Sequence, residues 1–136
     1  MSTSPTEALG SLTMMAADGR LDVFCAEAGI RLLIVFGSAV DPHVAEPRDL
    51  DIAVELAPTS DLVTVTTALV RLLSCDVVDV MNLGRASIPA RAAAFRSSMP
   101  LFEDEAGRFA RQSMLALAIA ADTDWIRDLQ LRGLAS

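Results

Sequence analysis

The sequence predicts a small α/β (α+β) domain in which a mixed sheet is flanked by helices. The near-continuous apolar run from Arg31 to Phe36 is typical of a strand buried on both faces. Residues 50–56 alternate between apolar and other side chains, which is typical of a strand with one face toward a core. Residues 62–73 and 106–131 carry apolar side chains at helical spacing. Strands and helices therefore alternate along the chain.

The bulk composition indicates one globular domain spanning residues 1–136. The chain is 52% hydrophobic and 21% charged, within the range of folded proteins, and 136 residues support a single core. Its net charge of −7 argues against a general nucleic-acid binder, because phosphate backbones are held by cationic surfaces. Cys25 and Cys75 lie in apolar segments and are expected to be buried reduced thiols. No signal peptide or membrane span is evident, so we expect a cytoplasmic protein.

The first 29 residues predict two short helices. Ser4 and Glu7 form a capping box around Pro5 at the start of the first helix. The Asp18-Gly19-Arg20 segment interrupts the apolar periodicity, and Gly29 is placed to end the second helix.

The middle of the chain is expected to contain an irregular loop, two strands and a helix between those strands. The loop from Ala39 to Arg48 contains two prolines and no apolar periodicity, so most of it is expected to be irregular. Cys75 to Met81 is expected to be a strand and Met99 to Phe102 a short edge strand. Ser87 is the predicted cap of a helix between them, which ends at Arg96.

The last predicted helix, within a C-terminal segment of residues 106–132, is unusually apolar. It carries two stripes, one of Met114, Leu117, Ala118, Ala121 and Trp125, the other of Leu115, Ile119, Ile126 and Leu129. A surface helix needs only one such stripe. Two stripes predict burial against the domain on one side and against a partner or a second copy on the other; the alternative is a single wide core face.

The candidate chemistry lies at the ends of the two central strands. Gly37 allows a backbone to pass close to a phosphate, and Ser38 offers a hydroxyl and an N–H to the same group. Asp49 and Asp51 fall on one face of their strand, where two neighbouring carboxylates repel each other and a divalent cation relieves the repulsion. Hard oxygen ligands suit Mg²⁺, which carboxylates commonly share with substrate phosphates. The pattern predicts phosphoryl-transfer chemistry.

These residues resemble a known family. A strand ending in Gly37-Ser38, ten further residues, and Asp49-Leu50-Asp51 opening the next strand is similar to the signature of minimal nucleotidyltransferases of the DNA polymerase β superfamily. The resemblance covers about residues 21–102 and implies a palm-like fold. It also implies that the two aspartates bind Mg²⁺ together with a third carboxylate from a later strand. Asp76 takes that position in Cys75-Asp76-Val77, with Asp79 as the alternative.

The resemblance also implies an activity and a partner. Small members of the family act as antitoxins that transfer AMP from ATP to a tyrosine of a helical HEPN-domain ribonuclease toxin. This chain has no tyrosine, so a tyrosine acceptor must belong to another molecule. The implied roles are metal binding and catalysis for Asp49, Asp51 and Asp76, and nucleotide binding for Gly37 and Ser38.

Two departures from the family pattern leave alternatives open. Residues 39–42 read Ala-Val-Asp-Pro, without the usual basic residue and glycine, and Arg48 replaces the usual serine or threonine before Asp49. Arg48 is a candidate phosphate ligand, or a surface partner of Glu46 or Asp41. The second functional hypothesis is therefore a binding antitoxin that neutralises its toxin by contact alone. A small-molecule nucleotidyltransferase ranks third, because the chain has little spare length for an acceptor pocket.

Overall fold

Four strands form one mixed sheet in the computed structural model, which describes residues 2–135. Their order is β3 (Val78–Asn82), β2 (Leu50–Leu56), β1 (Ile30–Phe36) and β4 (Ser98–Glu103). β1 pairs antiparallel with both β2 and β4, whereas β2 and β3 run parallel. The predicted α+β class, the central buried strand and the edge strand near Met99 are all confirmed.

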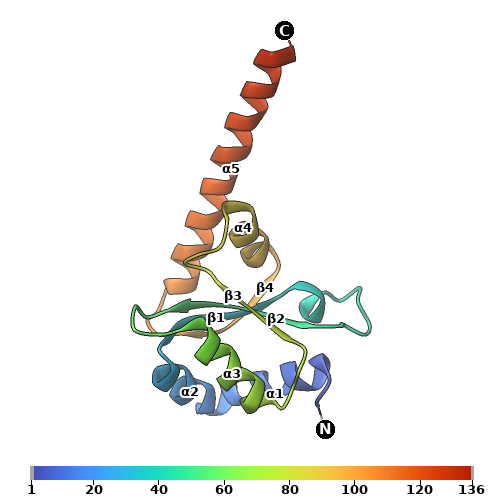
Figure 1. The fold of residues 1–136 in the computed structure, drawn as a ribbon, viewed down its shortest axis with the longest axis vertical. Helices are drawn as coiled ribbons and strands as arrows, with labels where there is room; N and C mark the ends of the chain where they lie inside the picture. The colour runs from blue at the N-terminus through green and yellow to red at the C-terminus, as the bar shows by residue number, and fades with distance from the viewer. Residues whose placement is uncertain (1, 136) are drawn as a thin grey trace.

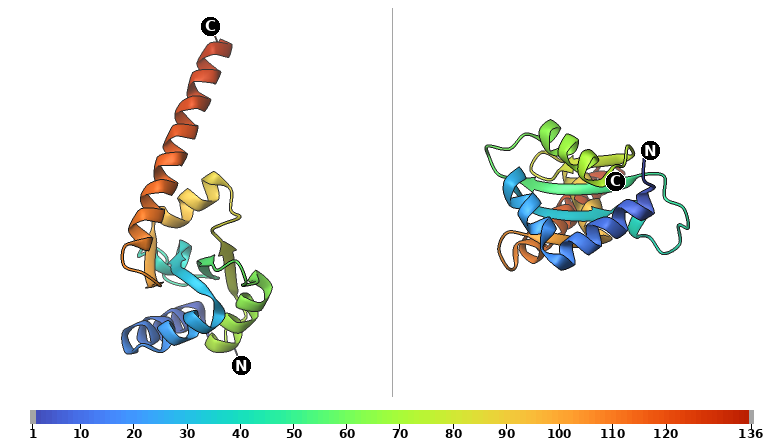
Figure 2. Two further views of the ribbon diagram at one scale, coloured as in Figure 1. Left: turned by 90° about the vertical axis from the view of Figure 1, so that its left-hand side faces the viewer. Right: turned by 90° about the horizontal axis from the view of Figure 1, so that it is seen from below.

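Helices cover the two faces of this sheet as separate layers (Figures 1 and 2). One face carries α1 (Pro5–Asp18), α2 (Arg20–Ala28) and α3 (Leu62–Leu73). On the other face lie α4 (Ile88–Arg96) and the first turns of α5 (Arg108–Ala135), the rest of which projects well beyond the domain. In the described part of the chain, no helix is both long enough and apolar enough to cross a membrane.

Local sequence signals set the helix ends as expected. The Ser4 hydroxyl accepts a hydrogen bond from the Glu7 backbone N–H at 3.2 Å, which caps α1. Gly19, with φ of +89°, separates α1 from α2, because a left-handed residue ends one helix before the next begins. Ser87 likewise accepts from the Ala90 N–H at the start of α4. The predicted break at residue 19 and the predicted cap at residue 87 are confirmed.

The sheet is buried on both sides. Toward α1–α3, β1 and β2 contribute fully buried side chains that include Leu33, Ile52 and Val54. Toward α4 and α5, a second cluster contains Ile34, Ala53, Phe95 and Ala116. Ala53, on the same face of β2 as Asp51, is fully buried, because α4 and α5 pack there. Asp51, near the start of β2, is partly exposed.

The packing face of α5 differs from both predicted stripes. Ala116 and Ala120 are 4% and 6% exposed and lie toward α4, where their small side chains allow the two helices to approach closely. Met114 and Leu115, one from each predicted stripe, are 73% and 54% exposed. The expectation that one stripe is buried against the domain is wrong, because alanines form the contact.

Candidate functional site

The turn after β1 brings the backbone against an aspartate. Gly37 begins a short 3₁₀ helix, η1 (Gly37–Val40), and has φ of +76°, a conformation that favours glycine. A Cβ placed on Gly37 would overlap Asp51 Oδ2 and lie 3.2 Å from Asp51 Cγ. The same glycine therefore makes the turn and leaves room for the Asp51 carboxylate, which joins the two halves of the Gly-Ser and Asp-x-Asp pattern.

Strand register explains why Asp51 lies at this turn. Asp51 on β2 is opposite Phe36, the last residue of β1, so the chain turns into Gly37 directly beside it. Asp49 lies two residues before Asp51, just ahead of β2, and is exposed. The structure therefore places Gly37 beside Asp51, one of the two predicted metal-binding aspartates.

The third carboxylate at this end of the sheet belongs to Asp79. Asp79 is the register partner of Asp51 on the neighbouring parallel strand, where paired residues lie roughly 4.8 Å apart and point to the same face. Asp76 lies before β3, which begins at Val78 rather than at the predicted Cys75. The placement of Asp76 on a strand beside the pair is wrong, and the alternative, Asp79, occupies that place.

The chain terminus explains the late start of β3. The Thr3 N–H donates to the Ser74 carbonyl at 2.7 Å, and the Asp76 N–H donates to the Ser2 hydroxyl at 2.9 Å. These bonds hold the segment after α3 against the N-terminal arm. A strand that began at residue 75 would need the Asp76 N–H for sheet pairing, whereas pairing with β2 begins at the Val77 carbonyl, which accepts from the Leu50 N–H at 2.9 Å.

The surroundings of Asp51 disfavour the simultaneous ionisation of Asp49, Asp51 and Asp79. Partial burial raises the pKa of the Asp51 carboxyl above its ordinary value of 3.8, and the neighbouring charges of Asp79 and Asp49 raise it further. The ionised form of Asp51 thus carries a free-energy cost that a bound cation would remove. A perturbed carboxylate of this kind, at the open end of a sheet, is typical of a functional site.

The three aspartates do not form a closed metal cage. Within residues 2–135, no three side chains of the histidine, cysteine, aspartate or glutamate type are grouped closely enough to hold a metal ion. Mg²⁺ usually takes only one or two protein carboxylates and completes its octahedron with water and phosphate oxygens. The donor chemistry of Asp49, Asp51 and Asp79 fits such a partial site, with room for a nucleotide to supply the remaining ligands.

The predicted nucleotide-binding side chains surround the same turn. Ser38 is partly exposed in η1, and its hydroxyl makes no hydrogen bond to any described residue. Arg48 is exposed directly before Asp49 and forms no ion pair with Glu46 or Asp41 among the described residues. The surface-pair alternative for Arg48 is therefore not seen, and its phosphate role stays a prediction.

One feature of the α4–α5 side was missed by sequence reasoning. Glu55 forms an ion pair with Arg108 at 3.0 Å, and only 15% of the Arg108 side chain is exposed. The two residues are 53 positions apart, so no local pattern signals the pair. Glu55 lies at the far end of β2 from Asp51 and takes no part in the aspartate cluster.

Comparison with known proteins establishes the class of fold. No family model matches this sequence, and no curated protein matches it either. Solved structures, in contrast, match over most of the chain. The fold is that of the minimal nucleotidyltransferases found in toxin–antitoxin complexes.

Three of these structures illustrate the match. A chain of a toxin–antitoxin complex with AMP-PNP has a TM-score of 0.66 and 17% identity, over 87% of this chain and 98% of that one. A chain of the complex between an MNT antitoxin and a tri-AMPylated HEPN toxin of Shewanella oneidensis has a TM-score of 0.63 and 16% identity, over 91% and 99%. A chain of the MntA–HepT complex has 0.61 and 17%, over 87% and 96%. At these identities the likeness establishes the fold, which confirms the predicted palm-like architecture.

Proposed function

We propose that this chain is a Mg²⁺-dependent nucleotidyltransferase that moves AMP from ATP to a hydroxyl of a helical HEPN-domain toxin, as the antitoxin of that pair. One observation carries the proposal. Asp51 and Asp79 are register partners on parallel strands, and Gly37 turns directly against Asp51. This arrangement places metal-binding carboxylates beside a backbone turn suited to phosphate.

Each residue has a defined role in the proposed reaction. Asp49 and Asp51 hold the cation, which neutralises negative charge that develops on the phosphates. The N–H groups of Gly37 and Ser38, with the Ser38 hydroxyl, bind phosphate oxygens, and Arg48 contacts the same group. Asp79 takes the role that the resemblance assigns to the third carboxylate and accepts the proton of the attacking hydroxyl. The acceptor oxygen bonds to the α-phosphorus, the bond to the β-phosphate oxygen breaks, and pyrophosphate leaves.

The structural neighbours support an adenine nucleotide as the donor and a HEPN toxin as the acceptor. One complex contains AMP-PNP, and another contains a HEPN toxin carrying three AMP groups. In a further MntA structure, two aspartates that are separated by a single residue are both replaced by glutamate. The same spacing separates Asp49 from Asp51. The absence of tyrosine from this chain is consistent with an acceptor on a second protein.

The proposal is tested by AMP transfer from ATP labelled at the α-phosphate. The product of the reading frame adjacent to this chain's gene serves as acceptor, with Mg²⁺ present or chelated. The wild type should label that protein only with Mg²⁺, and Asp51→Asn should lower labelling at least 100-fold. Labelling that Asp51→Asn retains, or that survives chelation, would contradict the mechanism.

A binding antitoxin without catalysis is the second candidate, favoured by the loop after Ser38. Asp41 is exposed there, and residues 39–42 include no basic residue that could contact the triphosphate. In this case an Asp51→Asn, Asp79→Asn double variant still protects cells from the toxin as fully as the wild type does. Loss of protection in the double variant, with binding to the toxin retained, assigns neutralisation to AMP transfer instead.

A further inference from the structure

The α5 helix has two unlike faces. The face toward α4 consists of small or short side chains around Ala116 and Ala120, and Phe109 near its start packs against Phe95 with ring centroids 5.9 Å apart. Thr123, Asp124 and Arg127 of α5 also line a pocket with residues of α4, so the two helices lie side by side for about five turns. Beyond Arg127 the helix continues to Ala135 and leaves the body of the domain (Figure 1).

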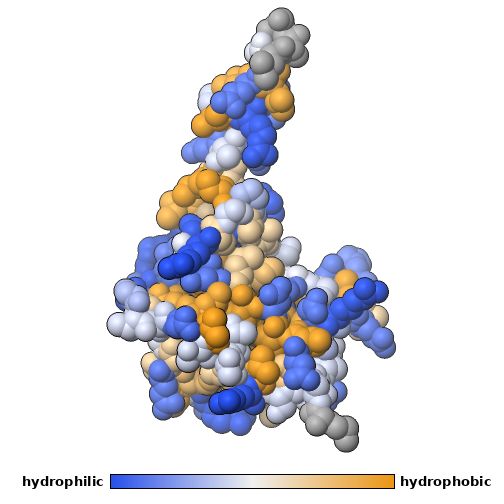
Figure 3. Space-filling model, in the orientation of Figure 1, coloured by the Kyte–Doolittle hydropathy of each residue, from blue (hydrophilic) through white to orange (hydrophobic). Residues whose placement is uncertain are grey.

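The opposite face of α5 is apolar and exposed. At about 100° per residue, five of its exposed large side chains fall within an arc of about 120°, one third of the helix circumference, which points away from the alanine contact. They are Met114, Leu115, Trp125, Ile126 and Leu129, with exposures of 73%, 54%, 64%, 51% and 47%. Apolar side chains also colour parts of the projecting helix in Figure 3. Several large apolar side chains exposed on one helix face are typical of an interaction site.

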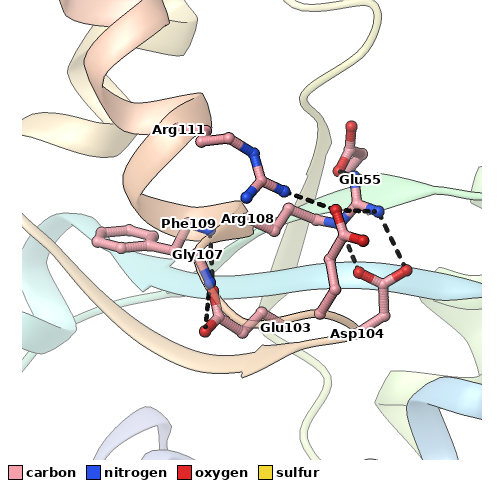
Figure 4. A network of polar contacts seen from close by, with 8 residues as sticks. Glu55, Glu103, Asp104, Gly107, Arg108, Phe109 and Arg111 are labelled. Atoms are coloured by element: carbon pink, nitrogen blue, oxygen red, sulfur yellow. Dashed lines mark hydrogen bonds and ion pairs between the residues drawn. The ribbon is translucent and has the colours of Figure 1, made fainter.

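The base of α5 is held firmly, so the exposed face is presented in a fixed direction. Arg108 bridges Glu55 on β2 and Asp104 before the helix, and Arg111 pairs with Glu105 (Figure 4). The carboxylate of Glu103 accepts from the backbone N–H groups of Gly107 and Phe109 at 3.3 and 2.9 Å, which caps the helix start (Figure 4). A projecting helix that is anchored in this way loses little freedom when it binds.

We infer that this face of α5 is the docking surface for a helical partner protein that receives it in a groove between two helices, with basic residues beside the groove. The inference deepens the proposed function and rests on it, since the helical partner named there is the occupant. The width of the face selects a groove. A second α5 in a coiled coil would cover only a narrow seam, whereas these five side chains span about 120° of the helix surface.

Charge identifies the chemistry of the groove. Asp122 and Asp128 lie one turn before and one turn after Trp125 on α5. Both carboxylates are exposed, so arginine or lysine on the partner would complement them. A second copy brings the same acidic residues and its own net charge of −7, which opposes self-association. Trp125 is thus the expected anchor of the interface.

Binding of the adjacent reading frame's product, measured by calorimetry, tests the inference with matched variants. Trp125→Asp should weaken binding at least about 30-fold, the effect of a single interface anchor. Val63→Asp is the control, because Val63 is 72% exposed on α3, on the other side of the sheet. It should change affinity less than twofold. Equal effects of the two variants, or a wild-type chain that does not bind the product, would overturn the inference.

Two further measurements separate the possible failures. Light scattering of the isolated chain should show a monomer; a dimer that Trp125→Asp dissociates would show that a second copy occupies the face. Asp51→Asn should bind the partner as tightly as the wild type while losing AMP transfer. If the wild type binds through Trp125 but transfers no AMP, the proposed function fails and the docking surface stands. If the wild type transfers AMP and Trp125→Asp binds the partner as tightly as the wild type does, the docking surface is wrong and the proposed function stands.

Discussion

Replacement of Gly37 by alanine tests the contact on which the candidate site depends. The new Cβ would overlap Asp51 Oδ2, and alanine would also have to adopt φ of +76°. A left-handed alanine costs about 1–2 kcal/mol. Moving the Asp51 side chain off its preferred rotamer costs about 0.5–1.5 kcal/mol more. Gly37→Ala should therefore lower the free energy of unfolding by roughly 1.5–3.5 kcal/mol.

Gly19→Ala separates the two contributions. Gly19 has φ of +89°, but a Cβ there would have no neighbour within 4 Å, so only the backbone term applies. The difference between the variants, about 0.5–1.5 kcal/mol, measures the clash with Asp51. In thermal unfolding Gly37→Ala should melt roughly 2–5 °C below Gly19→Ala.

Unfolding with and without MgATP completes this experiment. MgATP should raise the melting temperature of the wild type and of Gly19→Ala by the same amount, since Gly19 is remote from the aspartates. Gly37→Ala should lose most of this increase, because its Asp51 is displaced. An equal response of all three proteins would refute the placement of a metal–nucleotide site between Gly37 and Asp51.

Three further predictions concern charge and burial. Asp51→Asn should raise the melting temperature of the metal-free chain at pH 7, because burial and neighbouring carboxylates raise the pKa of Asp51. Asp76→Asn, at an exposed position outside the sheet, should not. Because its pKa is raised, Asp51 takes up a proton at a higher pH in the folded chain than in the unfolded chain. The difference in melting temperature between Asp51→Asn and the wild type should therefore narrow as pH falls from 7 toward 3.8. Arg108→Met should destabilise the chain by about 1–2 kcal/mol, because its ion pair is mostly buried. Arg20→Met, in an exposed pair, should leave the melting temperature unchanged. The Cys25 thiol is buried, which raises its pKa to about 12, so it should react with a thiol reagent at pH 8 only after unfolding.

Local signals predicted most of the fold. The alternating pattern of residues 50–56 and the helical pattern of residues 62–73 gave the bounds of β2 and α3 to the residue. Ser87 marked the start of α4, and Gly19 the break between α1 and α2. Each of these signals acts within a few residues of the backbone it directs, so the sequence alone was sufficient.

Contacts between residues far apart in the sequence determine which aspartate lies beside Asp51, and local sequence patterns did not predict them. Asp76 and Asp79 both follow a hydrophobic-Asp-hydrophobic pattern, and only the start of β3 distinguishes them. Just before that start, the Ser74 carbonyl accepts a hydrogen bond from the Thr3 N–H, and the Asp76 N–H donates to the Ser2 hydroxyl, in each case more than 70 positions away. The parallel register between β2 and β3 then places Asp79, not Asp76, beside Asp51.

The packing of α5 shows a second kind of limit. Hydrophobicity predicted that one of its large apolar stripes faces the domain, but close helix approach needs small side chains, and Ala116 and Ala120 provide them. Met114, Leu115, Trp125, Ile126 and Leu129 of the two predicted stripes are exposed. The ion pair of Glu55 with Arg108 fixes the direction of the helix and connects segments 53 residues apart. Neither feature follows from periodicity.

The central claim is that Asp51 and Asp79 form one site for AMP transfer to a partner protein. Mass spectrometry of the adjacent reading frame's product, after incubation with ATP and Mg²⁺, tests it most directly. The wild type and Asp76→Asn should add AMP groups to that protein, whereas Asp79→Asn should add almost none. Full modification by Asp79→Asn, or its loss only in Asp76→Asn, would contradict the site that the sheet register defines.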